Sequence, residues 1–301
     1  MEMDIEIIQR IDEKLKKGKR REIIDFFIGG LIILSVVLFA WIDPDIDSNL
    51  SIAIIVVLLI AMLVWQNGTE VLHQKERDRI SGELGGYLIN EKFPDMQYNL
   101  KSDLPKKMVK TDMGFQIEYK KIRIRDQIRG EYKGNLFDLS MVSYITKGYQ
   151  QPGRRTLFSP ELVVFRGPWI IMKAAKSFYG EINIASRIPQ TETLQTYMEP
   201  TGNGQFDKVL GAAVQDERDL RIFENQNLLV WLNQLHLHAG GRIFLKILQD
   251  GTIYFYAHSD RDLFRFQEYG ASADELKCGY EYELREIQKI LEDLIKIQKE
   301  I

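Results

Sequence analysis

The sequence predicts an α+β protein with an N-terminal two-helix transmembrane hairpin, followed by a cytoplasmic domain of mainly antiparallel sheet with flanking helices and a long C-terminal amphipathic helix. Three observations predict this fold class: two apolar runs near the start, alternating strand patterns through the middle, and a helical apolar stripe at the end. The expected boundaries are a basic amphipathic helix at 1–22, the hairpin at 23–67, the α+β domain at 68–270 and the amphipathic helix at 271–301.

Two uncharged apolar runs, Phe26–Ile42 and Leu50–Trp65, predict the hairpin. A bilayer core of about 30 Å needs roughly 17 to 25 helical residues, and residues on either side of the runs supply the missing length. Only a helix satisfies its own backbone groups inside lipid. The alternatives are a buried core hairpin and a cleaved signal peptide. The residues at 41–44, Trp-Ile-Asp-Pro, do not form the small-residue site that signal cleavage requires.

The charged flanks predict the orientation of the hairpin. Basic residues precede the first run and follow the second, whereas the connection 43–49 has three aspartates and no Lys or Arg. The positive-inside rule then places both termini in the cytoplasm. The predicted membrane-interface residues are two tryptophans and three basic residues: Trp41, Trp65, Lys19, Arg20 and Arg21.

Charge and cysteine content narrow the class of protein. The net charge of −3 combines a basic juxtamembrane segment with a mildly acidic remainder, so the basic residues indicate contact with the lipid bilayer and not with nucleic acid. The single cysteine, Cys278, excludes internal disulfides and fits a reducing compartment. Because it has no recognisable catalytic context, we interpret Cys278 as an unreactive helix residue.

Two helices are predicted beside the hairpin. Ile5, Ile8, Ile11 and Leu15 recur at helical spacing in the N-terminal segment, and this stripe needs a partner, either the cytoplasmic leaflet or another helix. Thr69–Glu91 is expected to continue the second span as a helix out of the bilayer.

From residue 113 the pattern changes to strands. Alternation from Phe115 to Tyr144, the apolar run Glu161–Ala174 and the segment Glu181–Ile188 follow one another without intervening helices, which favours an antiparallel sheet. The loop before Pro160 carries Arg154 and Arg155. These arginines are either solvated or contact an anion or a partner.

The next block predicts a helix over Asp216–Ala239, interrupted near Asn225, and then a hairpin of residues 242–248 and 252–258. The dipeptide Asp250-Gly251 predicts a type I′ turn between its strands.

The C-terminal segment, Ser272–Ile301, has a sustained apolar stripe that includes Ile287, Ile290, Leu294 and Ile297. Packing within the chain is the default. A protein partner, or a homo-oligomer formed through this helix, is the alternative.

Several stretches together resemble the bacterial family known as domain of unknown function 3137, roughly from the hairpin to Phe266. They are VVFRGPWIIMKAAKSFYGEINI at 163–184, FDKVLGAAVQDERDLRIF at 206–223, LLVWLNQL at 228–235 and RIFLKILQDGTIYFYA at 242–257, followed by DLFRF. Leu210 departs from the second aromatic expected after Phe206. The resemblance implies a bacterial membrane protein with an α+β cytoplasmic domain. Together with the two spans and the cytoplasmic termini predicted from the apolar runs and their flanks, it gives a location in the bacterial inner membrane. It supplies no catalytic residues.

No motif in the sequence specifies chemistry. It contains no phosphate loop, nucleophile elbow, zinc-protease motif or dinucleotide fingerprint. His236 and His238 lack further ligands at convincing spacing, so we predict no metal, cofactor or catalytic residues.

The leading hypothesis for function is a membrane-anchored cytoplasmic module that binds a protein, lipid or small ligand. The alternative is a membrane-associated enzyme with an unrecognised site. A transporter or channel subunit ranks last, because the apolar runs contain no ionisable residue that would line a pathway.

Overall fold

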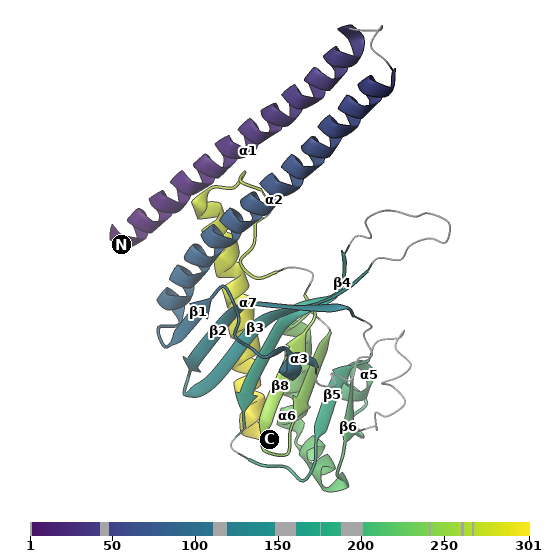
Figure 1. Ribbon diagram of the computed structural model, residues 1–301. Helices are drawn as coiled ribbons and strands as arrows, with labels where there is room; N and C mark the ends of the chain where they lie inside the picture. The colour runs from purple at the N-terminus through teal and green to yellow at the C-terminus, as the bar shows by residue number, and fades with distance from the viewer. Residues whose placement is uncertain are drawn as a thin grey trace. The chain divides into compact units, whose positions relative to one another are not determined.

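The computed structural model describes residues 2–42, 48–110, 119–147, 161–174, 176–187, 201–240, 242–259, 262–266 and 268–301 (Figure 1). The chain divides into two compact units. The first contains residues 1–84 with Arg265–Gly279, and the second contains Gly85–Phe264 with Tyr280–Ile301. The expected mixed α+β class is confirmed, because helices accompany one eight-stranded antiparallel sheet.

Helix α1 (Glu2–Ile42) and the part of α2 (Ser48–Lys92) up to Leu84 make up most of the first unit. Ile11 and Leu15 of the predicted apolar stripe are buried, as is Ile80 of α2. Glu83 of α2 pairs with Arg10 at 2.8 Å and also with Lys14. Of the two partners predicted for the N-terminal stripe, the structure therefore shows a helix.

Tyr269, in the segment Arg265–Gly279, packs against α1 where Gly18 leaves room. A Cβ at Gly18 would lie 2.3 Å from Cε1 of the Tyr269 ring. The Tyr269 hydroxyl donates to the carbonyl oxygen of His73 at 3.2 Å, and the Ala273 amide donates to Asp12 at 3.0 Å. Gly18 thus serves close packing in a helix that would otherwise favour a larger residue.

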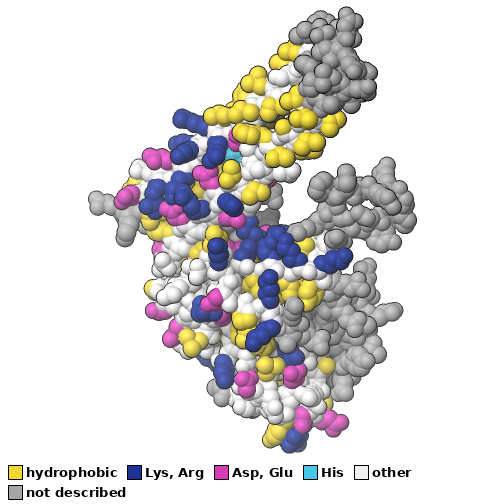
Figure 2. All heavy atoms as spheres, viewed as in Figure 1, with side chains coloured by type: hydrophobic (Ala, Val, Ile, Leu, Met, Phe, Trp, Pro, Cys, Tyr) yellow, Lys and Arg dark blue, Asp and Glu magenta, His cyan; other side chains and the backbone are white. Residues whose placement is uncertain are grey.

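The apolar part of the first unit is exposed. Phe26 is 78% exposed, and further apolar side chains of both helices lie on the surface (Figure 2). Among the described residues, one helical stretch, Val56–Lys92, is long and apolar enough to cross a membrane by length and composition. That finding supports one of the two predicted spans. The two-span hairpin itself stays a prediction.

The second unit is built on one sheet with the strand order β1-β2-β3-β4-β8-β7-β5-β6, and every neighbouring pair is antiparallel (Figure 1). The strands are β1 (Met96–Asn99), β2 (Lys121–Tyr132), β3 (Asn135–Lys147), β4 (Glu161–Lys173), β5 (Ile182–Ser186), β6 (Leu210–Val214), β7 (Ile243–Ile247) and β8 (Thr252–Ala257). Phe115, which we predicted to lie on a strand, is outside the described residues.

The two faces of this sheet are covered by different helices. The short α3 (Lys106–Lys110) covers one face, where Val109 packs in a cluster with Val142 and Tyr256. Alternate residues of a strand point to opposite faces. Met141 and Ala257 therefore belong to the other face, which carries α6 (Gln226–His238) and α7 (Ala273–Glu300).

The predicted C-terminal helix is confirmed as α7. Its apolar stripe is buried within this chain, with Leu284, Leu294 and Ile297 fully covered. A homo-oligomer through this helix stays a prediction.

The predicted interrupted helix over Asp216–Ala239 is two helices. A 3-10 helix, η1 (Glu217–Glu224), precedes α6. Asn225 separates them, and its side chain accepts hydrogen bonds from the amides of Asn227 and Leu228 and so caps α6. A helix α5 (Phe206–Val209) precedes β6.

The predicted hairpin is confirmed as β7 and β8, but its predicted type I′ turn is wrong. Such a turn needs positive φ at both central residues, and of Asp250 and Gly251 only Gly251 has it, at +82°. The Gly251 amide donates to the Leu248 carbonyl at 2.9 Å, as in a type I turn followed by a glycine bulge. Gly251 is needed there also because a Cβ would lie 2.4 Å from the Lys176 carbonyl oxygen.

Candidate functional site

A cavity of about 530 Å³ lies on the α6 and α7 face of the sheet, within the second unit. Strands β3, β4 and β8, the C-terminal end of α6, the chain after β8 and the middle of α7 contribute its walls. Its lining includes Met141, Pro168, His238, Arg242, Ala257, Ser259, Asp262, Leu263, Glu283, Glu286, Ile287 and Ile290. The volume is within the usual range of small-molecule sites, about 300 to 1,000 Å³.

The regular pairing of β4 and β8 is interrupted at the wall of the cavity. Their pairing ends at Trp169 and Tyr256, and the next residue of β4, Pro168, has no N–H to continue the ladder. The Ala257 carbonyl then crosses close to Gly167, where a Cβ would lie 1.7 Å from its oxygen. The Ser259 amide donates to the Arg166 carbonyl at 2.7 Å and holds the departing chain. The sequence Gly167-Pro168 thus interrupts the regular ladder and brings the backbone of Ala257 against β4.

A histidine held by a buried carboxylate forms part of the wall. His238 is at the end of α6, and its Nδ1 lies 2.5 Å from Oδ2 of Asp293 on α7. Asp293 is only 2% exposed. A carboxylate partner at Nδ1 favours the tautomer with its proton there, which leaves Nε2 as a hydrogen-bond acceptor or proton acceptor.

Asp262 brings charge to the same wall. Its carboxylate pairs with Arg125, and its Oδ1 lies 3.4 Å from Nε of Arg166. Glu283 accepts a hydrogen bond from the Phe264 amide at 2.7 Å, and Glu286 pairs with Lys289 at 2.9 Å. The cavity therefore combines apolar strand and helix side chains with acids that already have protein partners.

His236 is two residues before His238 and has a structural position. Ser186 accepts a hydrogen bond from the Ile243 amide at 2.9 Å, and its hydroxyl lies 3.0 Å from Nδ1 of His236. A serine hydroxyl can donate its proton to an unprotonated ring nitrogen, so this contact is compatible with neutral histidine. Burial lowers the pKa of His236 below its ordinary value.

We expect this burial to make stability depend on pH. Because the folded pKa is below the unfolded value of about 6.5, His236 favours folding above that value. This contribution is lost as the pH falls through the lower, folded pKa. Thermal unfolding of wild type and His236→Asn at pH 7.5 and 5.5 should show a smaller acid-induced loss in the variant, whose side chain still accepts from Ser186. Equal losses in both proteins would contradict this role.

The site residues predicted from the sequence lie in other parts of the chain. Lys19, Arg20 and Arg21 are exposed on α1, and Trp65 on α2 is 40% exposed, all in the first unit. The Trp41 side chain, Arg154 and Arg155 are outside what the structure describes. Of the predicted residues that the structure describes, Lys19, Arg20, Arg21 and Trp65, none lines the cavity.

The cavity was missed because its lining comes from separate segments of the chain. One sequence signal was available: Asp293 interrupts the apolar stripe of α7 between Ile290 and Ile297, where an acid needs a buried partner. In the described part of the chain, no group of three or more His, Cys, Asp or Glu side chains is arranged to hold a metal ion.

Together, these features define an α+β protein with an eight-stranded antiparallel sheet and a helix apolar enough to cross a membrane. No protein-family model and no curated protein matches the chain. Among solved structures, it is similar to the crystal structure of the mycobacterial trehalose monomycolate transport factor A, TtfA. The TM-score is 0.36 and the sequence identity 8%, over 72% of this chain and 96% of that one. A likeness at this level supports no conclusion about function.

Proposed function

We propose that this protein is a membrane-anchored module whose α+β domain binds a small ligand in the cavity. The observation that carries the proposal is the cavity itself, with a volume suited to a small molecule and both apolar and polar walls. The anchor consists of the two apolar helical segments, α1 from residue 26 and α2 up to residue 65, with both termini in the cytoplasm of a bacterial cell. The resemblance to domain of unknown function 3137 is part of this proposal.

The anchor is supported by the surface of the first unit. Hydrophobic side chains cover one end of its helix pair, and Lys and Arg gather toward the other (Figure 2). A basic segment beside an apolar helix remains on the cytoplasmic side and contacts anionic lipids. Lys19, Arg20 and Arg21 are exposed in that segment and have this proposed role, with Trp65 at an interface.

Topology is tested with reporters. Alkaline phosphatase fused after Ile301 should be inactive, and green fluorescent protein at the same position should fluoresce, because both report a cytoplasmic C-terminus. A phosphatase inserted between α1 and α2 should be active. A fluorescent C-terminal fusion combined with an inactive phosphatase between the helices would exclude the two-span arrangement.

Ligand binding is tested by thermal unfolding of the detergent-solubilised full chain against fatty acids, nucleotides, amino acids and sugars. A compound at about 100 times its Kd adds about 2.7 kcal/mol, which corresponds to a shift of several degrees. Ala257→Leu, which extends a lining side chain into the cavity, should abolish the shift. Val230→Leu, on an exposed position of α6, should preserve it.

If no compound class shifts the unfolding temperature, or if Ala257→Leu binds as well as wild type, the cavity is not the ligand site.

A second candidate function is an enzyme that uses the same cavity, and the contact between His238 and Asp293 favours it. A histidine oriented in this way is a suitable general base. Turnover of any compound found by the binding screen should fall about 100-fold or more in His238→Asn while binding remains. If the wild type binds a compound but does not convert it, the enzyme is excluded and the protein is a binding module.

A further inference from the structure

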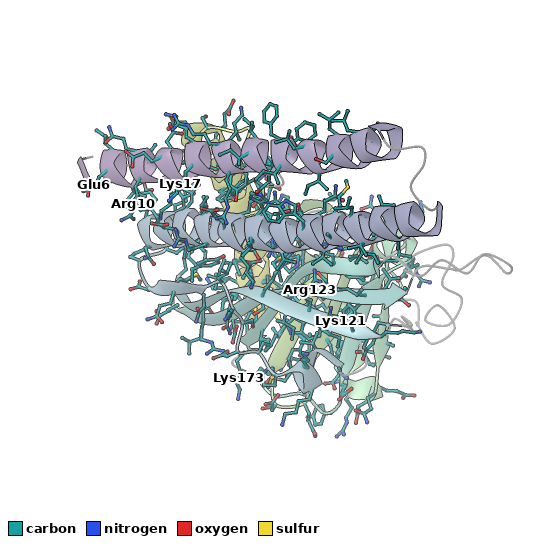
Figure 3. All side chains as sticks on the ribbon, turned by 45° about the horizontal axis from the view of Figure 1, so that its top comes forward. Glu6, Arg10, Lys17, Lys121, Arg123 and Lys173 are labelled. Carbon is teal, nitrogen blue, oxygen red and sulfur yellow. The ribbon has the colours of Figure 1, made fainter. Side chains whose placement is uncertain are left out.

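Three arginines meet on the α6 and α7 face of the sheet. Lys121, Arg123 and Arg125 alternate along β2 with Ile122, which packs in the α3-side cluster, so the basic side chains share the opposite face. Figure 3 labels Lys121 and Arg123 on this strand. In the register of β2, β3 and β4, Arg123 lies opposite Ser143, which lies opposite Arg166. Directly opposed side chains in neighbouring strands are about 5 Å apart. Ser143 therefore lies between two arginines, next to a third.

The inner two arginines share one loop carboxylate. Arg125 is 9% exposed, and it pairs with Asp262, as does Arg166. Asp126 adds a weaker contact, with its Oδ2 3.4 Å from Nε of Arg125. Within the described part of the chain, the buried Nε atoms of Arg125 and Arg166 make no hydrogen bond. The Nε–H of each guanidinium is therefore a donor that Asp262 does not satisfy.

Asp262 comes from the chain that follows β8, and not from a strand of the sheet. A carboxylate on such a connection can leave the arginines without breaking a strand ladder, whereas Arg125 and Arg166 are fixed in β2 and β4. The groups on the strands are cationic and the group on the connection is anionic. This arrangement suits a site that the protein occupies with its own anion until another anion replaces it.

We propose that Arg123, Arg125 and Arg166 bind a phosphate monoester, and that Asp262 occupies this site in the absence of the phosphate group. Arginine forks bind phosphate oxygens in pairs, and the Ser143 hydroxyl adds a neutral donor. A phosphate monoester carries about 1.5 to 2 negative charges at neutral pH, compared with the single charge of a carboxylate. Its three non-bridging oxygens can also accept hydrogen bonds from arginine N–H groups that Asp262 does not satisfy. The inference goes beyond the proposed function, because it holds whether or not the cavity beside Asp262 binds a molecule.

The opposing explanation is that Asp262 only neutralises two buried arginines. The two explanations predict different effects of Asp262→Asn on phosphate affinity. If Asp262 competes with phosphate, its neutralisation should increase phosphate affinity about tenfold. If Asp262 is only structural, the variant should lose stability without gaining phosphate affinity.

The experiment uses the full chain in a neutral detergent and measures thermal unfolding with increasing inorganic phosphate at constant ionic strength, adjusted with chloride. Arg123→Gln should reduce phosphate affinity about tenfold. The side chain of Arg123 is exposed, so this variant should fold. Arg129→Gln is the matched control, because Arg129 is also an exposed arginine of β2, and its partners Asp103 and Asp138 do not belong to the proposed site. It should bind phosphate as the wild type does.

A second measurement distinguishes a lipid headgroup from a free phosphate compound. Wild type and Arg123→Gln are reconstituted in nanodiscs of phosphatidylcholine alone or with phosphatidic acid, whose headgroup is a phosphate monoester. Stabilisation by phosphatidic acid, but not by inorganic phosphate, identifies a headgroup site, whereas stabilisation by both identifies a general phosphate site.

The inference is overturned if neither phosphate source stabilises the wild type. It is equally overturned if Arg123→Gln and Arg129→Gln reduce the response by the same amount, because the effect would then be one of general charge.

Discussion

Gly167→Ala is expected to unfold the sheet domain or to lower its free energy of unfolding by about 3 kcal/mol or more. A Cβ at this position would lie 1.7 Å from the Ala257 carbonyl oxygen and 2.9 Å from its carbon. Both atoms are backbone, so neither can move without shifting β8 or β4. Separation of these segments would also break the hydrogen bond from the Ser259 amide to the Arg166 carbonyl.

Hydrogen exchange of the purified full chain measures this effect. Amides of β4 and β8 should lose protection in Gly167→Ala, or the protein should fail to accumulate. Gly204→Ala is the control, because nothing lies within 4 Å of the added Cβ and the residue does not have positive φ. A Gly167→Ala protein with wild-type protection would show that the close approach of β4 and Ala257 is not needed.

The second large effect is expected at Gly18. A mid-helix glycine is about 1 kcal/mol less favourable than alanine, so Gly18→Val would change little in a helix with a free face. Here the added atoms overlap the Tyr269 ring, whose nearest atom is 2.3 Å from the Cβ position. The Tyr269 hydroxyl donates a hydrogen bond to the His73 carbonyl, and Cζ of Arg77 lies 5.7 Å from the centroid of the Tyr269 ring. We expect a net loss of about 3 kcal/mol in the docking of Arg265–Gly279.

A compensating variant separates this packing effect from helix propensity. Gly18→Ala should destabilise on its own, but Gly18→Ala in a Tyr269→Ala background should stabilise slightly, because the clash is gone and alanine favours the helix. Limited proteolysis near residue 267 and thermal unfolding measure both proteins. Additive effects of the two substitutions would refute the proposed contact between Gly18 and Tyr269.

The regular elements could largely be predicted because their signals are local. The stripe of α7, the end of α2 near Phe93 and the strands β7 and β8 follow from residue spacing within each segment. Asp250-Gly251 indicated a turn, but the position of Gly251 within it depends on the Lys176 carbonyl, which is distant in sequence. Local pattern therefore identified the hairpin and could not select its turn type.

Long-range features could not be predicted. Gly18 lies within a helix, and the reason for a glycine there is the ring of Tyr269, from the other end of the chain. The role of Asp262 could not be predicted, because its two arginines lie on β2 and β4. The wall of the cavity includes the irregular pairing of β4 and β8 near Pro168, and sequence spacing does not reveal this long-range pairing.

The strand order also has a consequence for biosynthesis. Strands β1 to β4 pair in sequence, but β4 acquires its second neighbour only when β8 is made, after β5, β6 and β7. During translation, the growing chain therefore presents β4 as an open edge, with unpaired N–H and C=O groups. If the apolar N-terminal helices have already entered a bilayer, these nascent chains are kept apart on its surface. Membrane insertion would then protect a slow, non-local strand pairing from aggregation.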